Sequence, residues 1–203
     1  MRFAPKVDVS RETTERLQAY VALLEKWNPR INLVSKSTLA DAWGRHIRDS
    51  LQIVSLAPPN WKKWADLGSG GGFPGLVVAI AANEINPRGR VVLVESDQRK
   101  CAFLRTVIRE TGVDADVVSG RIESVEPLGA DVISARALAD LSTLLGYAER
   151  HGAKGFTGLL PKGATWEKEL FQARQAWEFS CEPYRSETEE KSVILRIEGV
   201  ARV

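Results

Sequence analysis

The chain has 203 residues, of which 44% are apolar and 27% charged, and its formal net charge is only +2. This composition is typical of a globular domain and excludes general disorder, and no apolar run approaches the roughly 20 residues of a membrane-spanning helix. The start, Met1–Lys6, lacks the apolar stretch of a secretory signal, so we expect a cytoplasmic protein without a membrane partner.

Cysteines and histidines are few and widely spaced. The chain contains Cys101 and Cys181, with histidines at His46 and His151. Such a set cannot form a cysteine-rich zinc site or a disulfide framework. We therefore expect no bound metal, and we interpret both cysteines as packing residues.

The first sixty residues are predicted to be helical, and their 9 basic and 6 acidic side chains give a local charge of +3. Apolar residues at helical spacing, with Ser10 as the N-cap, predict a first helix that ends at Asn28–Pro29. Thr38, with Asp41 three residues later, is expected to begin a second helix that Pro58–Pro59 stops. We take this pair as the boundary between an N-terminal helical extension, residues 1–60, and a core, residues 61–203, within one compact domain.

Beyond Trp61, short apolar runs alternate with helical stretches. Strands are expected at 63–67, 91–95, 115–119, 130–134, 156–160, 177–184 and 192–198. Helices are expected near 74–83, 97–111, 138–151 and 164–176. Strands joined by crossover helices predict an α/β fold with a mostly parallel sheet covered on both faces. The last two strands are too close in sequence for a helical crossover and should form an antiparallel hairpin.

A glycine-rich loop, Gly68-Ser69-Gly70-Gly71-Gly72-Phe73-Pro74-Gly75, follows the first of these strands. Glycine lets the backbone turn sharply and touch a ligand, and Pro74 suits the first turn of a helix. The register Gly70-x-Gly72-x-x-Gly75 formally fits a dinucleotide fingerprint. The register Asp66-x-Gly68-x-Gly70-x-Gly72 fits better and resembles the S-adenosylmethionine loop of Rossmann-like methyltransferases. In that interpretation, Asp66 helps to orient the ammonium at the amino acid end of the cofactor.

Glu95 is a further candidate for cofactor binding, because it ends the next predicted strand, 23 residues beyond Gly72. A carboxylate at this place can accept hydrogen bonds from the hydroxyl groups of a ribose. Glu95 therefore supports either cofactor, whereas its alternative interpretation is a solvated strand end.

With the flanking segments added, the chain resembles the RsmG/GidB family, bacterial methyltransferases acting on guanine N7 of small-subunit ribosomal RNA. The resemblance extends over nearly the whole chain, and its most restricted parts are Gly72-Phe73-Pro74-Gly75 and His46-Ile47-Arg48-Asp49-Ser50-Leu51. The other matching segments are Trp27-Asn28, Ile31–Leu33, Glu95-Ser96, Lys100 with Phe103-Leu104, Arg121–Glu123, Ile133–Ala137 and Leu160–Gly163.

This resemblance implies a Rossmann-like fold with a seven-stranded sheet whose last strand is antiparallel, and S-adenosylmethionine as the cofactor. Gly68 and Phe73 would contact the cofactor from the loop, and Glu95 would hold its ribose. The remaining residues at matching positions are Ile122 and Glu123, which would flank the adenine, and Arg136, beside the cofactor and target base. Many members have Asp in place of Glu95, and in many a Ser directly precedes the Arg, whereas Ala135 intervenes here.

The sequence also lacks motifs that other methylations require. No Asn/Asp-Pro-Pro-aromatic tetrapeptide, which grips exocyclic amines, follows the fourth predicted strand, and no Pro-Cys dipeptide is present to attack a pyrimidine. Guanine N7 bears an in-plane lone pair and no proton, so its methylation needs a near-attack geometry and no general base. We therefore predict catalysis by positioning, with Arg136 beside the reacting groups.

The predicted RNA contacts are Arg45, His46 and Arg48 on the second helix, Lys100 at a helix start, Arg136, and Lys162 after the fifth core strand. For His46, a core histidine hydrogen-bonded to Asp49 or to backbone is an equally good interpretation. The expected partner is 16S ribosomal RNA or a small-subunit particle, and we expect a monomer. Two other interpretations stay open: a nicotinamide-dependent oxidoreductase, and an inactive protein that binds an adenosyl ligand or RNA.

Overall fold

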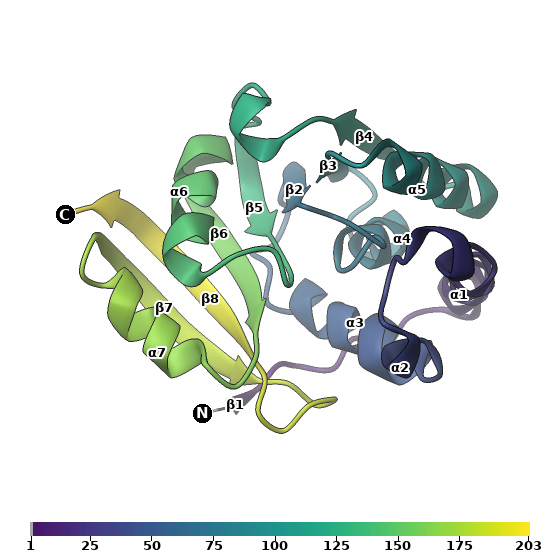
Figure 1. Cartoon of the computed structure of the whole chain (residues 1–203), viewed down its shortest axis with the longest axis horizontal. Helices are drawn as coiled ribbons and strands as arrows, with labels where there is room; N and C mark the ends of the chain where they lie inside the picture. Colours follow the sequence, from purple (N-terminus) through teal and green to yellow (C-terminus); the bar gives the residue numbers. More distant parts are fainter. Residues whose placement is uncertain (1) are drawn as a thin grey trace.

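The computed structural model describes residues 2–203, and it shows one central sheet with helices on both faces (Figure 1). The strands run in the order β1-β7-β8-β6-β5-β2-β3-β4 across the sheet. Their bounds are β1 (Arg2–Phe3), β2 (Lys63–Leu67), β3 (Arg90–Glu95), β4 (Ala115–Ser119), β5 (Ala130–Ser134), β6 (Gly152–Lys162), β7 (Trp177–Arg185) and β8 (Val193–Arg202).

The helices alternate with these strands along the chain. They are α1 (Arg11–Ile31), α2 (Lys36–Leu39), α3 (Asp49–Val54), α4 (Gly75–Ile85), α5 (Gln98–Thr111), α6 (Leu141–His151) and α7 (Trp166–Ala173). A π-helical turn, η1 (Trp43–Arg48), leads into α3, and a 3-10 turn, η2 (Ile122–Ser124), follows β4. None of these helices is long and apolar enough to cross a membrane, a finding that applies to residues 2–203.

Alternating side chains along the strands build two apolar cores, one on each face of the sheet. Trp64 and Leu93 belong to the core under α1, α3, α4 and α5, whereas their neighbours Ala65 and Val94 belong to the core under α6 and α7. Successive strand residues point to opposite faces, so strands covered on both sides must be apolar throughout. This explains the uninterrupted apolar run Val91–Val94 of β3.

The mostly parallel sheet and the C-terminal hairpin are confirmed. Strands β2 to β6 pair in parallel where they are neighbours, and β8 pairs antiparallel with both β6 and β7. The described chain contains eight strands, one more than the seven expected, because Arg2–Phe3 adds a short parallel strand beside β7. The strand order reverses at β2, which lies between β3 and β5, and ligands of open α/β sheets bind at such a point.

The prediction that Asn28–Pro29 ends the first helix is wrong, because α1 continues to Ile31. Proline removes only its own N–H donor, and the Asn28 side chain compensates at the end of the helix. Its Oδ1 accepts hydrogen bonds from the backbone N–H groups of Leu33 and Val34, each at 2.8 Å. Asn32, at φ 48°, then turns the chain out of the helix.

The second predicted helix is also corrected, because it is not continuous and does not begin at Thr38. Ser35 caps the short α2, with its Oγ accepting from the Thr38 N–H, and the chain enters the π-helical turn η1 only at Trp43. Asp41 Oδ1 accepts a hydrogen bond of 3.1 Å from the Gly44 N–H at the start of that turn. π-Helical turns are rare and are frequent at functional sites, and this one carries three of the predicted RNA contacts.

The N-terminal helices pack on the same side of the sheet as α4 and α5 and share their core. Leu17, Tyr20 and Leu24 of α1 are fully buried in it. Thr13 Oγ1 donates a hydrogen bond of 2.7 Å to Glu84 at the end of α4, and Glu84 also accepts from the Ser10 N–H. The division at residue 60 stays a prediction.

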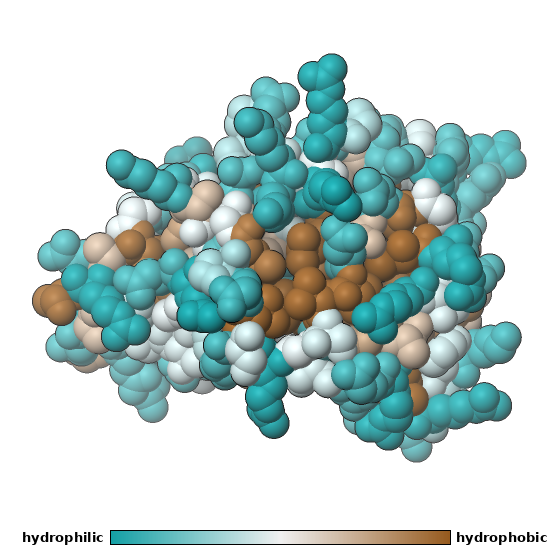
Figure 2. Space-filling model, turned by 90° about the horizontal axis from the view of Figure 1, so that it is seen from above, coloured by the Kyte–Doolittle hydropathy of each residue, from teal (hydrophilic) through white to brown (hydrophobic). Residues whose placement is uncertain are grey.

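Most large apolar side chains are buried, but some reach the surface. Seen from above the orientation of Figure 1, a band of apolar side chains crosses the middle of one face, between charged side chains that project around it (Figure 2). The exposed large apolar residues are Phe3, Ile85, Leu138, Phe171 and Val203. Leu138 lines the cleft that is described next.

Candidate active site

The glycine-rich loop after β2 uses conformations that side chains disfavour. Gly68, Gly70 and Gly72 have φ angles of 68°, 55° and 93°. L-residues with a Cβ atom rarely adopt this region, so the sequence spacing of the glycines follows from the backbone path. At Gly72, packing also requires the absence of a side chain. A Cβ atom there would lie 2.3 Å from Leu76 Cδ1 and 2.7 Å from the Tyr20 hydroxyl oxygen.

Asp66 lies beneath this loop and is fully buried. Its Oδ1 accepts a hydrogen bond of 2.7 Å from the Ser134 hydroxyl, and its Oδ2 accepts one of 3.3 Å from the Gly75 N–H. Burial raises the pKa of this carboxyl group to about 6, against the lowering effect of these hydrogen bonds. Asp66 therefore ties β2 to β5 and to the start of α4. The predicted direct contact with a cofactor is corrected, because Asp66 does not line the cleft.

A cleft of about 480 Å³ lies above the carboxyl ends of β2, β3 and β5. The predicted site residues that line it come from five separate segments of the chain. They are Gly68, Gly70, Phe73, Glu95, Lys100, Ile122, Glu123 and Arg136. Gly72, like Asp66, is absent from its walls and supports the loop from behind. The structure therefore gathers most of the predicted cofactor residues around one space, at the point where the strand order reverses.

Glu95 ends β3 inside this cleft, and its side chain holds the loop in place. Its Oε2 accepts a hydrogen bond of 2.8 Å from the Gly70 N–H, and its Oε1 accepts from the N–H groups of Ser96 and Asp97. A carboxylate has about four acceptor positions, so one remains for a ligand hydroxyl group. Glu95 thus links the glycine loop to the start of α5.

The far wall of the cleft is formed after β4. Ile122 is buried and presents an apolar surface, and Glu123 next to it accepts a hydrogen bond from the Tyr147 hydroxyl of α6. Tyr147 and Leu33 also line the cleft, although neither was a predicted site residue. Leu33 belongs to the matching segment Ile31–Leu33, whereas Tyr147 lies in no matching segment and looks like an ordinary helix residue.

Arg136, after β5, lies at one end of the cleft above the ring of Phe73. Its guanidinium carbon is 4.9 Å from the ring centroid, and its Nη1 is 3.8 Å from Asp49 Oδ2. The next residue, Ala137, has a φ of 52°, which is strained for a residue with a side chain. The chain therefore makes a sharp turn immediately after Arg136, and this turn directs the arginine back over the loop.

The other predicted RNA contacts have partners within the protein. Arg45 pairs with Glu189 at 2.6 Å, and Arg48 lies 3.9 Å from Glu187, whereas Lys100 lines the cleft. The structure gives Lys162 a role different from the predicted RNA contact, because its side chain is only 8% exposed. Its ammonium donates to the Ala139 carbonyl oxygen and pairs with Glu169, both at 2.7 Å, so it supports the loops beside the site and is not free for a phosphate.

His46 is buried and stacks on Phe73, with ring centroids 4.7 Å apart. The alternative in which it donates a hydrogen bond to Asp49 is not observed, and Asp49 Oδ1 accepts from Ser186 and Thr188. Within residues 2–203, neither ring nitrogen of His46 has a hydrogen-bond partner. Burial, reinforced by the positive charges of Arg136 and Arg45, lowers the pKa of the imidazole to about 4, so the ring is neutral at physiological pH.

Solved structures with a similar fold are methyltransferases. A methyltransferase from Geobacter sulfurreducens superposes with a TM-score of 0.58 at 16% identity, covering 96% of this chain and 90% of its own. An O-methyltransferase from Bacillus cereus, solved in complex with SAH, gives a TM-score of 0.56 at 14% identity, covering 95% and 93%. The fold is therefore that of the Rossmann-like, S-adenosylmethionine-dependent methyltransferases.

Sequence relatives are much closer. The chain is 56% identical over 200 residues to the ribosomal RNA small subunit methyltransferase G of Ruegeria pomeroyi, with 98% of both chains covered. It is 54% identical over 198 residues to the protein of the same name from Ruegeria sp. (strain TM1040), covering 98% of this chain and 96% of that one. The model of the GidB family, rRNA small subunit methyltransferase G, matches residues 13–193. The chain belongs to this family, and the alternative of a nicotinamide-dependent oxidoreductase is wrong.

The cleft residues fit S-adenosylmethionine. A Cβ atom at Gly70 would meet nothing closer than 3.8 Å, so the loop leaves open space on that side for a ligand. Glu95 offers a carboxylate for a ribose, Ile122 an apolar wall for a base, and the volume of about 480 Å³ suits a ligand of this size.

Proposed function

We propose that this protein transfers a methyl group from S-adenosylmethionine to N7 of one guanine in 16S ribosomal RNA. The strongest support is the family match over residues 13–193. The cleft adds a physical basis, because it collects the glycine loop, Glu95 and Arg136 at the carboxyl edge of the sheet. An inactive binding protein would not need to keep a complete cleft of this kind.

We assign the cofactor contacts to the residues that line the cleft. Gly68, Gly70 and Phe73 form the surface on which the amino acid end lies, and Glu95 accepts hydrogen bonds from the ribose. Ile122 and Glu123 enclose the adenine, with Tyr147 orienting the Glu123 carboxylate through its hydroxyl group. Asp66 and Gly72 act indirectly, because they fix the loop from below and from behind.

The chemistry asks little of the protein beyond orientation. When bound, S-adenosylmethionine supplies a sulfonium methyl whose C–S bond breaks with its electron pair remaining on sulfur, while the N7 lone pair forms the new bond and the positive charge passes to the guanine. No proton moves in this step, so no general base is needed. The neutral His46 and the permanently charged Arg136 agree with this, since neither is a base that could accept a proton at neutral pH.

The RNA would approach the side where Arg45, Arg48 and Lys100 lie. Each cation that meets a phosphate adds salt-dependent affinity, and the small number of such cations implies moderate electrostatic binding. We propose that the protein acts as a cytoplasmic monomer on ribosomal RNA or on a small-subunit precursor particle.

Mass spectrometry of 16S ribosomal RNA from cells with and without the gene tests this function. We expect one 7-methylguanosine to disappear with the gene and to return with its wild-type copy. In parallel, calorimetry should show binding of S-adenosylmethionine and not of NADH. An unchanged modification pattern would exclude the proposed reaction.

A further inference from the structure

A second cavity, of about 360 Å³, lies beside the cofactor cleft. Leu33, Arg136 and Ala137 line both spaces, so the two adjoin at Arg136. The walls of this cavity come from the segment 33–38, from η1 with Asp49, and from the loop between β7 and β8. A group in this cavity would therefore lie next to the cofactor cleft, enclosed by residues 33–49, by Arg136 and Ala137, and by the loop between β7 and β8.

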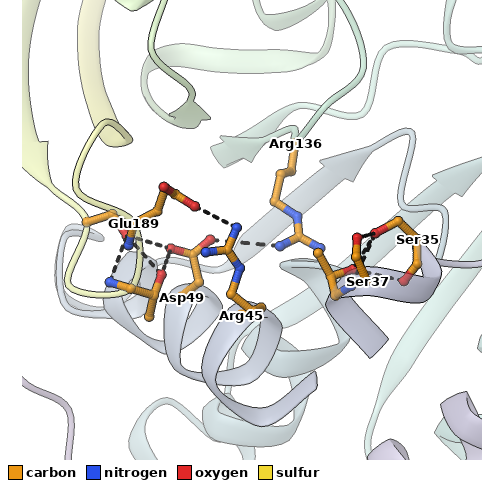
Figure 3. Close-up of polar contacts among 9 residues, drawn as sticks. Ser35, Ser37, Arg45, Asp49, Arg136 and Glu189 are labelled. Atoms are coloured by element: carbon orange, nitrogen blue, oxygen red, sulfur yellow. Dashed lines mark hydrogen bonds and ion pairs between the residues drawn. The ribbon is translucent and has the colours of Figure 1, made fainter. Parts of the chain in front are cut away.

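Asp49 provides an unused acceptor in this cavity. Its Oδ1 accepts hydrogen bonds from the hydroxyl groups of Ser186 at 3.0 Å and Thr188 at 2.9 Å. Its Oδ2 receives no hydrogen bond from residues 2–203 and only faces Arg136 Nη1 at 3.8 Å. Figure 3 shows Arg136 reaching toward Asp49 and Arg45 turning to Glu189, whose carboxylate is occupied by that pair at 2.6 Å. Asp49 Oδ2 thus lies beside Arg136 in this cavity as a carboxylate oxygen that receives no hydrogen bond within residues 2–203.

His46 also lines this cavity and is only 7% exposed. Both of its ring nitrogens are buried and have no hydrogen-bond partner within residues 2–203. The imidazole therefore contributes a packed wall to the cavity, and Asp49 supplies the acceptor.

We propose that this cavity receives the target guanine, and that Asp49 accepts hydrogen bonds from its N1–H and 2-amino groups. This inference rests on the proposed function and adds the residue that selects the base. Adenine would present an acceptor at N1 and no 2-amino group to the Asp49 carboxylate, so it is rejected because a buried carboxylate oxygen is left unpaired. Bases that undergo chemistry are commonly drawn into a pocket and read on this edge.

The same contact favours the reaction itself. The guanine ring acquires a positive charge when N7 is methylated, and its N1–H and amino groups become stronger donors. A carboxylate already hydrogen-bonded to that edge stabilises the charge as it develops, without accepting the proton. Asp49 then selects guanine and assists its methylation through one interaction.

The test compares guanine with inosine, which keeps N1–H, O6 and N7 and lacks only the 2-amino group. The substrate is a synthetic 16S ribosomal RNA fragment that carries either base at the modified position found by mass spectrometry. For the wild-type protein, we expect kcat/KM to be at least about tenfold lower with inosine. The Kd of the two fragments, measured with S-adenosylhomocysteine in the cleft, should differ in the same direction. In Asp49→Asn, we expect the difference to shrink to within about threefold.

Thr188→Val is the matched control, because it removes a hydrogen bond to Asp49 and leaves the carboxylate in place. It should keep the wild-type preference for guanine over inosine. A wild-type protein that treats the two fragments alike overturns the inference without any variant, and so does a folded Asp49→Asn protein that keeps the full preference. If the wild-type protein methylates neither fragment, the proposed function itself fails, which is a different result.

Discussion

The two cavities that meet at Arg136 are built in different ways. The cofactor cleft is shaped by backbone, with glycines of positive φ on one side and the Glu95 carboxylate bound to three N–H groups. The adjoining cavity is shaped by side chains, and His46 and Asp49 meet Arg136 and Thr188 there from distant parts of the sequence. A backbone-built pocket depends on a few local constraints, whereas a side-chain pocket depends on the whole tertiary structure.

The largest effect on stability and cofactor binding should follow from a substitution in the glycine loop that shapes the cofactor cleft. Gly72→Ala places a Cβ atom at a φ of 93° and within 2.3 Å of Leu76 Cδ1. We expect the free energy of unfolding to fall by about 3 kcal/mol or more, with loss of cofactor binding. Gly112→Ala is the control, because its φ is 64° and a Cβ atom there meets nothing within 4 Å. It should cost only about 1 kcal/mol in denaturant unfolding; equal losses in the two variants would contradict the packing explanation.

Removing the residue shared by both cavities should abolish most activity without unfolding the protein. We expect Arg136→Ala to lower the methylation rate at saturating cofactor by roughly 100-fold, because it removes a side chain that lines both spaces. Arg174→Ala is a fair control, since Arg174 also lies over an aromatic ring, Phe179, at 5.9 Å, but away from the site. Circular dichroism should show that both variants are folded. Normal transfer by Arg136→Ala would reject its role.

His46, which lines the second cavity, should make the stability of the protein depend on pH. The pKa of His46 is lowered to about 4 in the folded protein, so the unfolded chain binds the extra proton between that value and 6.5. Wild-type stability should therefore be complete above pH 6.5 and fall by about 2–3 kcal/mol toward pH 4 from this group alone. Asp66 has the opposite effect, because its raised pKa of about 6 makes the folded state gain stability on acidification.

The measurement is denaturant unfolding at pH 7, 6 and 5 for the wild-type protein and for His46→Gln. The variant lacks the titrating imidazole, so its stability should decline less on acidification, or rise because of Asp66. Parallel pH profiles for the two proteins would show that His46 is not held neutral by the fold.

The smallest expected effect separates two lysines that looked alike in sequence. Lys100 lines the cleft, whereas Lys162 is buried in an ion pair with Glu169. Lys100→Ala should weaken RNA binding and reduce the slope of log Kd against log salt by about 1. Lys162→Ala should leave that slope unchanged and lower stability instead, since it leaves the Glu169 carboxylate without its partner. A shallower slope for Lys162→Ala would show that Lys162 contacts an RNA phosphate.

These residues also show how far the sequence alone reaches. The spacing of Gly68, Gly70 and Gly72 after an apolar strand identified the cofactor loop, because local backbone geometry restricts those positions. The burial of Asp66 was not predictable, since its partners Ser134 and Gly75 meet it only in the folded sheet. Tyr147 and the free oxygen of Asp49 depend in the same way on contacts across the fold. Helix ends were misplaced where a side chain, such as Asn28, replaced backbone hydrogen bonds.

The short strand β1 has a consequence for biosynthesis. Arg2 and Phe3 pair with Tyr184 and Arg185 of β7, almost at the other end of the chain. Strand β1 therefore has no partner until β7 has been synthesised, although the intervening strands and helices can already assemble. The outer edge of the sheet can close only at that stage, and without residues 2–3 the strand β7 would be an unpaired edge.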